Sequence, residues 1–244
     1  GVSISDNTVK DNYIHNNGGL GVAVQVDPGA TASGNTVKDN HIHDNWGGGM
    51  VLGAFDFPAP PASGGALVSG NTVKNNRIHN NGNEVNGLGG ILLNAADFFD
   101  NGINPTVSDN TVKDNEIHGN ARHGIWLSAL VANNGKATIS NNTIKGNDIE
   151  SSTGWGVEIL GNPGLPPFFV DGTVVDNTFR SNTFAGNGLG EIHWPAAAKV
   201  TALLRSTTWG VIKTQRPRVI APVESDMGNV EDLLNRYGLD QLGR

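Results

Sequence analysis

Apolar and polar residues alternate over short stretches along most of this chain. In residues 7–15 the apolar side chains expected to point into a core are those of Val9 and Ile14. The side chains on either side of each are expected to point outward. A period of two is typical of short β-strands with one buried face. Asp11 and Asn12 separate the two groups and favour a tight bend. The stretch therefore predicts two short strands joined by a bend.

This nine-residue stretch occurs six times along the chain, and this repetition determines the fold class that we predict. The copies begin at Asn7, Asn35, Asn71, Asn110, Asn142 and Asn177, with spacings of 28, 36, 39, 32 and 35 residues. The variable period and the abundance of Asn, Gly, Thr, Val and Ile disfavour helical repeats. A third apolar strand is expected after most copies, at 22–24, 50–52, 91–93, 125–127 and 157–159. Three strands per repeat predict one coil of an all-β parallel solenoid.

Stacking of such coils explains the asparagines, which number 31 beside 34 glycines. Consecutive coils lie about 4.8 Å apart, so each repeat position stacks on its predecessor. One predicted ladder contains Asn12, Asn40, Asn76, Asn115, Asn147 and Asn182, and a second contains the six asparagines that begin the copies. Stacked amides can bond to one another and to the backbone groups of a bend. The predicted role of these residues is structural.

Two outward columns carry titratable side chains. The first consists of His15, His43, His79 and His118, for which we expect ring stacking; metal ligation by pairs is the alternative, disfavoured because metal sites converge from several directions. The second consists of Lys10, Lys38, Lys74, Lys113, Lys145 and Arg180. Asp11, Asp39 and Asp114 adjoin this second column, which favours a self-neutralised surface over a stripe that binds an acidic polysaccharide. No metal site is assigned.

Composition and charge exclude several classes of protein. The net charge of −7 without a basic block argues against nucleic-acid binding. The absence of Cys excludes disulfides, thiolate zinc sites and thiol catalysis. No apolar run reaches the roughly 18 residues of a membrane span. Charged residues make up only 16%, which is unlike a charge-rich disordered chain.

Together the six copies and their asparagine positions resemble the right-handed parallel β-helix superfamily, the pectate-lyase-like fold, and especially its Asn/Gly-rich repeat proteins. The resemblance covers residues 1–194 and implies a β-helix of about six coils. It also implies an extracellular or cell-surface location. Calcium is the cofactor that the lyases of this fold use, so the resemblance leaves calcium binding by this chain open. Lyases, hydrolases, epimerases, tailspikes and non-catalytic scaffolds share the fold, so it does not decide activity.

The composition changes after residue 194, which predicts a second region at 195–244. A short α-helix is expected at about 226–237, where apolar residues recur at helical spacing before Gly238. The last coil of a solenoid exposes strand edges and apolar interior. The tail is therefore interpreted as a cap on that coil or as a segment that joins subunits.

Candidate functional residues lie on the third strands and on the variable loops that follow them. The candidates for catalysis are His123 as a base, Arg122 and Glu158. The candidates for substrate binding are Asp56, Asp97, Phe98, Asp100 and Trp126. An outward apolar strip beside them, which includes Val51 and Leu92, is interpreted as a sugar-stacking surface, a subunit interface or strand covered by loops.

The catalytic patterns of the resembling enzymes are incomplete in this chain. Asp27-Pro28 matches part of the Asp-Pro-His element of the epimerases, but Gly29 occupies the histidine position. The first functional hypothesis is therefore a surface module that binds a polysaccharide, with lyase-like or epimerase-like processing left open. The second is a non-catalytic structural subunit of a fibre, spike or sheath, with self-association through the helix and its tail.

Overall fold

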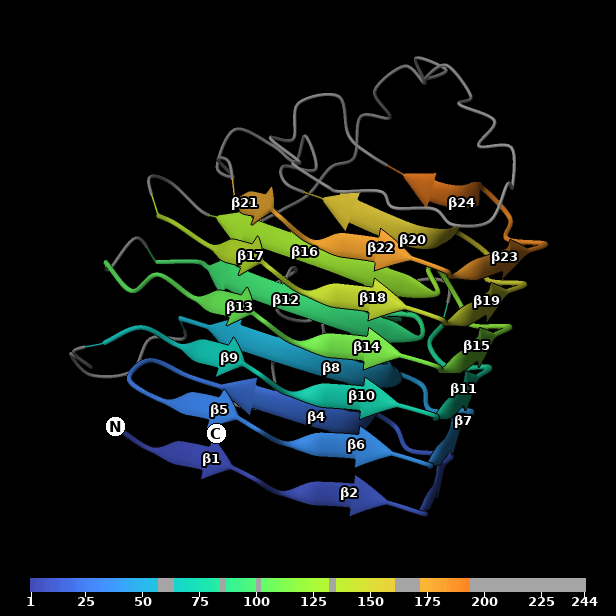
Figure 1. Cartoon of the computed structure of the whole chain (residues 1–244), viewed down its shortest axis with the longest axis horizontal. Helices are drawn as coiled ribbons and strands as arrows, with labels where there is room; N and C mark the ends of the chain where they lie inside the picture. The colour runs from blue at the N-terminus through green and yellow to red at the C-terminus, as the bar shows by residue number, and fades with distance from the viewer. Residues whose placement is uncertain (57–63, 84–86, 100–101, 132–134, 161–171, 194–244) are drawn as a thin grey trace.

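The computed structural model describes residues 1–56, 64–83, 87–99, 102–131, 135–160 and 172–193. These residues form a parallel β-solenoid in which four strands make up each coil and the coils stack on one another (Figure 1). The predicted all-β parallel β-helix is confirmed. The predicted helix at 226–237 and the tail at 195–244 lie outside the described residues.

The strands form four parallel sheets of six strands each. Sheet A contains β1 Ser3–Ser5, β5 Thr31–Ser33, β9 Leu67–Ser69, β13 Thr106–Ser108, β17 Thr138–Ser140 and β21 Thr173–Val175. Sheet B contains β2 Thr8–Lys10, β6 Thr36–Lys38, β10 Thr72–Lys74, β14 Thr111–Lys113, β18 Thr143–Lys145 and β22 Thr178–Arg180. Sheet C contains β3 Tyr13–His15, β7 His41–His43, β11 Arg77–His79, β15 Glu116–His118, β19 Asp148–Glu150 and β23 Thr183–Ala185. Sheet D contains β4 Leu20–Val26, β8 Gly48–Phe55, β12 Ile91–Asp97, β16 Ile125–Val131, β20 Trp155–Leu160 and β24 Gly190–His193.

The expectation of three strands per coil is wrong, because sheet A adds a fourth. Its strands are three residues long and carry one inward residue, such as Ala32 in β5 or Val107 in β13. The strands of sheets B and C are equally short, so length is not the reason. The repeated stretch was compared only from its first asparagine onward, and each sheet A strand lies just before that asparagine. The sheet D strands, at four to eight residues, are the long side of each coil.

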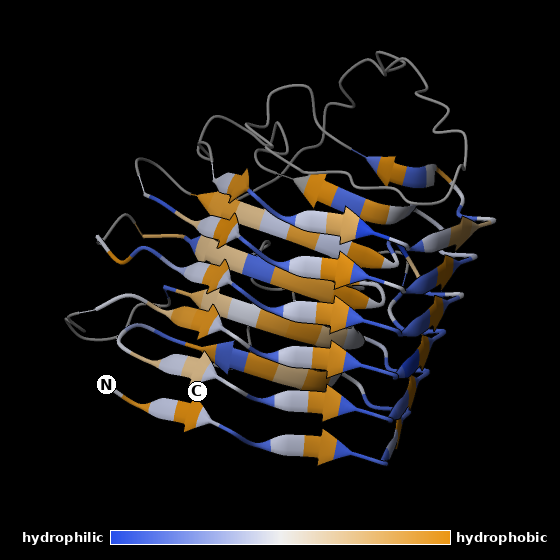
Figure 2. Cartoon of the chain, in the orientation of Figure 1, coloured by the Kyte–Doolittle hydropathy of each residue, from blue (hydrophilic) through white to orange (hydrophobic). Residues whose placement is uncertain are grey.

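The core is a single apolar column inside the coils. Each sheet contributes one inward residue per short strand, and Val73, Ile78 and Val112 are fully buried in this way. Hydropathy colouring shows the same division, with apolar strand centres and polar bends (Figure 2). The close stacking leaves no room at the corner between sheets C and D, where a Cβ on Gly90 would lie 2.5 Å from the Gly124 carbonyl oxygen.

Both predicted asparagine ladders are confirmed, and a third exists. In the central ladder the Nδ2 of Asn76 donates to Oδ1 of Asn115 at 3.0 Å and to the Val37 carbonyl at 3.0 Å. The Asn76 backbone N–H donates to the same Oδ1. The third ladder lies at the bend before sheet D and contains Asn17, Asn45, Asn81 and Asn120, continued by Ser152 and Asn187. It was not predicted, because the repeated stretch was compared only as far as the histidines.

Each bend places a left-handed residue directly before the ladder residue. Asp11, Asp39 and Asp114 have φ between 55° and 57°, and Gly occupies this place at positions such as Gly146. Asp, Asn and Gly tolerate this conformation better than other residues do. The Asp-Asn and Gly-Asn dipeptides of the repeat are therefore determined by the bend geometry.

Replacing Asn115 with Ala should destabilise the protein by about 3 kcal/mol or more, because buried donors and acceptors on both neighbouring coils lose their hydrogen bonds. Urea denaturation measures the change. The matched control is Asn104→Ala, since Asn104 is exposed and its side chain makes one long hydrogen bond among the described residues, to the Gly102 carbonyl oxygen at 3.4 Å. Equal effects of the two substitutions would contradict a structural role for the ladder.

Candidate functional site

One outward column crosses sheet D from its first strand to its last. In register it contains Ala23, Val51, Leu92, Trp126, Glu158 and His193. Val51, Leu92 and Trp126 are each 2% exposed and pack with Leu88. The apolar part of the strip is therefore buried, and it is no open surface on which sugar rings could stack.

The column becomes polar at its far end, where Glu158 follows Trp126. Glu158 is 5% exposed, and burial raises the pKa of its carboxyl group, an effect that its hydrogen bond with His193 opposes. Its Oε1 lies 2.9 Å from Nδ1 of His193. Its Oε2 is also buried and has no hydrogen-bond partner among the described residues. A buried carboxylate oxygen without a hydrogen bond destabilises the folded chain unless a ligand or a water molecule donates a hydrogen bond to it.

Arg122 and His123 approach the same column from the loop before β16. The Arg122 guanidinium lies 5.1 Å from the Trp126 ring centroid, a cation–π arrangement. The His123 ring meets Trp126 edge-on at 5.5 Å, and its Nδ1 accepts the Trp155 backbone N–H at 3.1 Å. The three sequence candidates for catalysis therefore surround one tryptophan.

The hydrogen bonds of His123 and His193 give their two imidazole rings different chemical roles. Burial, followed by the charges of Arg122 and His193, lowers the pKa of His123 to about 4, so its ring is neutral at pH 7. Because Nδ1 of His123 accepts a hydrogen bond, the neutral ring carries its proton on Nε2 and acts there as a donor. In His193 the carboxylate holds the proton on Nδ1, which leaves Nε2 with a free lone pair. The arrangement favours His193 over His123 as the base.

His193 is positioned from two sides and stays accessible. Its ring stacks on Trp155 with centroids 4.9 Å apart and planes at 13°. Its side chain remains 39% exposed, whereas that of Glu158 is 7% exposed. Neither His193 nor Trp155 was predicted from the sequence. Extending the outward column of sheet D by one coil, from Glu158 into residues 190–193, would have found His193.

The loop candidates Asp56, Asp97 and Phe98 form a separate cluster. Both carboxyl groups are fully buried. Asp56 accepts the backbone N–H groups of Phe98 at 2.6 Å and Phe99 at 3.0 Å, and Asp97 accepts that of Lys136 at 2.7 Å. Burial, and then a hydrogen bond with Asp97, raises the pKa of Asp56 to about 7. The pair shares a proton through this hydrogen bond, and its other hydrogen bonds hold Phe98 and Phe99, which follow β12, and Lys136, which precedes β17.

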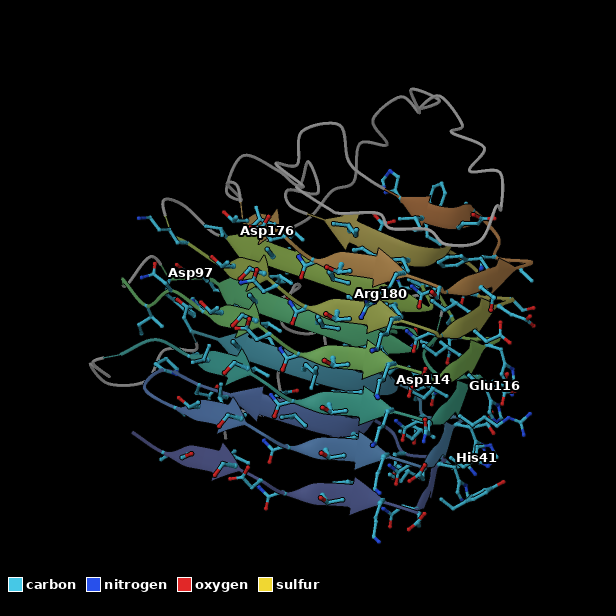
Figure 3. All side chains as sticks on the ribbon, viewed as in Figure 1. His41, Asp97, Asp114, Glu116, Asp176 and Arg180 are labelled. Atoms are coloured by element: carbon cyan, nitrogen blue, oxygen red, sulfur yellow. The ribbon has the colours of Figure 1, made fainter. Side chains whose placement is uncertain are left out.

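The structure does not bring this pair to the His193 cluster. Asp97 is paired with Val131 at the far end of its strand, five residues beyond Leu92, or about 17 Å along the sheet. Figure 3 shows Asp97 on the opposite side of the solenoid from His41 and Glu116. Phe98 is 7% exposed and packs with Phe55. The candidate Asp100 lies outside the described residues.

No three His, Asp or Glu side chains of the described residues are arranged to hold a metal ion. The buried carboxyls of Asp56 and Asp97 offer two acidic groups, but three of their contacts are already made by backbone N–H groups. Calcium binding therefore remains an expectation that rests on the family resemblance alone. Likewise, no helix of the described residues is long and apolar enough to cross a membrane.

The predicted histidine stack is confirmed on sheet C. The rings of His15, His43, His79 and His118 stack with centroids 4.7 to 5.0 Å apart and planes within 5°. A fifth imidazole, that of His41, joins them, with its Nε2 at 2.6 Å from Nε2 of His79. On sheet B, Lys10, Lys38 and Lys113 lie 3.7 to 3.9 Å from Asp11, Asp39 and Asp114, as a self-neutralised surface requires.

Comparison with known proteins agrees with this architecture. The family described as "right handed beta helix region" matches residues 1–190, so the chain belongs to this family of right-handed β-helices. No curated protein matches the chain. A solved structure that it resembles is the A-module of the mannuronan C-5 epimerase AlgE4 from Azotobacter vinelandii, with 15% identity and a TM-score of 0.44. The match covers 81% of this chain and 57% of the length of that one.

The His79 imidazole should make stability fall in acid. Burial, followed by the neighbouring His118, His41 and His43, lowers its pKa to about 4. Between pH 6.5 and 4 the unfolded chain thus binds a proton that the folded chain does not, so the free energy of unfolding decreases as the pH falls. His79→Gln should flatten this slope in urea titrations at pH 7.5, 6 and 5, with His15→Gln at the exposed end of the stack as control. An unchanged slope would contradict the assignment.

The Asp56 carboxyl should have the opposite effect. Its pKa of about 7 in the folded chain exceeds the ordinary value of 3.8, so folding takes up a proton between these values. Stability contributed by this group is therefore lost as the pH rises from about 4 to 7. Asp56→Asn should remove that loss, measured as the difference from wild type in melting temperature at pH 4.5 and 7.5. Asp11→Asn, which removes a surface carboxyl, is the matched control; if both variants track each other, the buried pair does not share a proton.

Proposed function

We propose that this chain is a carbohydrate-processing β-helix module whose site is the polar end of the sheet D column. The substrate class that fits is an acidic polysaccharide made of uronate units. The observation that carries the proposal is the buried Glu158 carboxylate, bonded to an accessible His193 imidazole, in a column that is otherwise apolar.

Each group at the site has a role in removing a proton next to a carboxylate. Arg122 offers a fixed positive charge, and a guanidinium suits a uronate carboxylate. Neutralising that carboxylate makes the adjacent C–H more acidic. His193 Nε2 accepts the proton, and Glu158 stabilises the resulting imidazolium. His123 Nε2–H donates to a substrate oxygen.

Proton abstraction of this kind begins both an elimination and an epimerisation. In elimination the glycosidic oxygen leaves and a double bond forms. In epimerisation a proton returns to the opposite face of the same carbon. Both are consistent with the groups at the site, and the product distinguishes them. Extracellular or cell-surface location belongs to the same proposal, since such polymers occur there.

Purified protein incubated with uronate polymers should give either an unsaturated product, detected by ultraviolet absorbance, or an epimer, detected by NMR. His193→Gln should lower kcat by about a hundredfold or more, the usual loss for a general base. Glu158→Gln should lower kcat and shift its pH profile, since Glu158 acts through His193. Arg122→Gln should raise KM. His15→Gln, on sheet C, is the control.

Wild-type protein that neither binds nor converts any uronate polymer would overturn the proposal. Equal activity in His193→Gln and wild type would remove His193 from the mechanism. Binding without turnover would leave a recognition module.

The burial of Val51, Leu92 and Trp126 also supports a second candidate, a non-catalytic structural subunit. A column closed to solvent along three coils offers little groove for a polymer, while continuous amide ladders suit a rigid spacer. Electron microscopy of the purified chain distinguishes the two, because a fibre or sheath subunit assembles into regular polymers.

A further inference from the structure

Arg122 has a backbone conformation that the described chain otherwise confines to its bends. Its φ is 65°, in the left-handed region. The other described non-glycine residues with a positive φ are Asp, Asn or Ser, and each directly precedes a ladder residue. Arg122 does not, and it lacks the short polar side chain that makes this conformation tolerable. Such a conformation persists only where its surroundings hold it, and it is often found at functional sites.

The next coil holds the Arg122 backbone on both sides. The Arg122 N–H donates to the hydroxyl oxygen of Thr153 at 2.7 Å. The N–H of Gly154 donates to the Arg122 carbonyl oxygen. A Cβ on Gly154 would overlap that carbonyl oxygen, so glycine is required for this close approach. The N–H and the carbonyl of Arg122 are therefore both bonded to consecutive residues between β19 and β20.

These contacts leave the Arg122 side chain with a fixed place and an uncompensated charge. The guanidinium lies 5.1 Å from the Trp126 ring centroid. Stacking uses one face of the guanidinium and leaves its N–H donors at the edge. Among the residues that the structure describes, no carboxylate is paired with Arg122, which is half-buried. A guanidinium in this state suits an anionic ligand.

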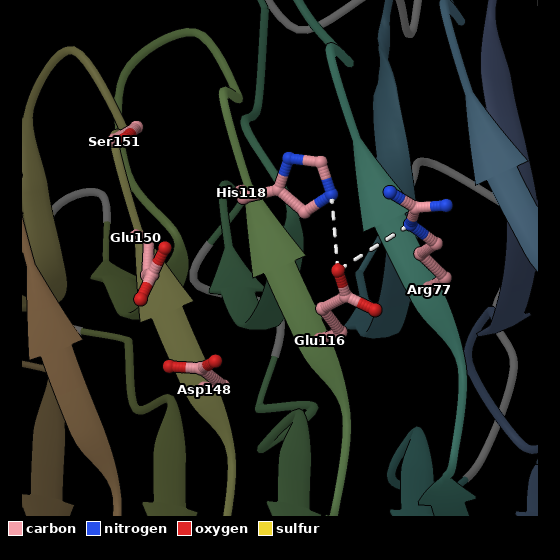
Figure 4. A pocket seen from close by; sticks show the side chains of 6 residues that line it. All are labelled: Arg77, Glu116, His118, Asp148, Glu150 and Ser151. Carbon is pink, nitrogen blue, oxygen red and sulfur yellow. Dashed lines mark ion pairs between the residues drawn. The ribbon is translucent and has the colours of Figure 1, made fainter.

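Arg77 differs from Arg122 in this respect. It lies in β11 and borders a hollow of about 240 Å³ on sheet C (Figure 4). The other residues that line the hollow are Glu116, His118, Asp148, Glu150 and Ser151. The Nε of Arg77 lies 3.4 Å from Oε1 of Glu116. Because Glu116 neutralises Arg77 and two more carboxylates line the hollow, a carboxylate ligand is not favoured there.

We propose that Thr153 is a positioning residue that makes the site selective for polymers with carboxylates, because its hydroxyl fixes the Arg122 guanidinium on Trp126 before the substrate binds. The inference rests on the proposed function, in which Arg122 receives a uronate carboxylate. The value of φ sets the direction of the Cα–Cβ bond. Without the Thr153 hydroxyl the Arg122 backbone relaxes towards the right-handed region, and the side chain turns away from Trp126. A guanidinium that must be ordered during binding holds a carboxylate less tightly than one already in place.

The position of Thr153 allows this role to be tested without unfolding the solenoid. Thr153 is exposed, and so is its hydrogen bond with Arg122. Loss of one exposed hydrogen bond changes the stability of a fold little. A weaker preference for carboxylates in a Thr153 variant would therefore reflect the position of Arg122.

The first test needs no substrate. Thr153→Val removes the acceptor and keeps the shape of the side chain, whereas Thr153→Ser keeps the hydroxyl. By NMR we expect amide hydrogen exchange at Arg122 to be about tenfold faster in Thr153→Val than in wild type, and unchanged in Thr153→Ser. Thr143→Val, on sheet B, is the matched control. Equal exchange in Thr153→Val and wild type would overturn the proposal.

The second test concerns the left-handed conformation. Arg122→Gly and Arg122→Ala both remove the guanidinium, but only alanine keeps a Cβ at the positive φ. Glycine adopts this conformation without strain, so Arg122→Gly should have the higher melting temperature. A higher melting temperature for Arg122→Ala would contradict the proposal, because Arg122 would then not be held in a strained conformation.

Selectivity is measured with a uronate oligomer and with its carboxyl-reduced, uncharged form. Wild type should bind the uronate more tightly, and this preference, the ratio of the two dissociation constants, should fall about tenfold in Thr153→Val, as in Arg122→Gln. Thr153→Ser should keep the wild-type preference, because it supplies the same hydroxyl. Arg77→Gln, which removes a paired guanidinium on sheet C, is the control and should leave the preference unchanged.

The outcomes separate this inference from the function on which it rests. A preference that is lost in Arg122→Gln but kept in Thr153→Val would overturn the role of Thr153 alone. Wild type that binds neither form would overturn the proposed function, and the selectivity with it. Faster exchange at Arg122 in Thr153→Val would even then establish that Thr153 holds Arg122 in place.

Discussion

The amide ladders are the constraint on which the rest of the structure depends. Each buried asparagine in the middle of a ladder bonds to the amide of the next coil and to a carbonyl of the preceding one, as Asn76 does with Asn115 and Val37. A coil shifted by one residue would leave these groups buried without partners, and each such group costs about 1–3 kcal/mol. The ladders therefore fix the register of every sheet, and so decide which side chains stack.

In-register stacking repeats chemistry as well as geometry. Stacked asparagines form hydrogen bonds with one another. A column of like charges, in contrast, requires opposite charges beside it, as Asp39 provides for Lys38. Unlike groups meet only where a column changes its residue type. Trp126 gives way to Glu158 and then His193 on sheet D, and Arg77 gives way to Glu116 on sheet C. The proposed site on sheet D lies at such a change.

The same constraint explains why the pH-sensitive groups are concentrated in few places. Five imidazoles are each held within about 5 Å of a neighbouring ring because the coils cannot separate. The Asp56 and Asp97 carboxyls are held together because β8 and β12 are adjacent strands. In each case the rigid stack prevents the groups from moving apart to relieve an unfavourable charge. Their effects on stability have opposite directions between about pH 4 and 7, so they offset each other in that range.

The sequence by itself determined the fold class, two of the three amide ladders, the histidine stack and the three lysine–aspartate pairs of sheet B. These features repeat, and six copies in register amplify a local period of two into a clear signal. The fourth strand of each coil was missed because it lies just before the asparagine at which the repeated stretch was taken to begin, as the strands around Ala32 and Val107 do. The burial of Val51 and Leu92, the hydrogen bond between His193 and Glu158 and the separation of Asp56 from these two residues were decided only by the tertiary structure. They depend on contacts between residues 28 or more positions apart, which no local period records.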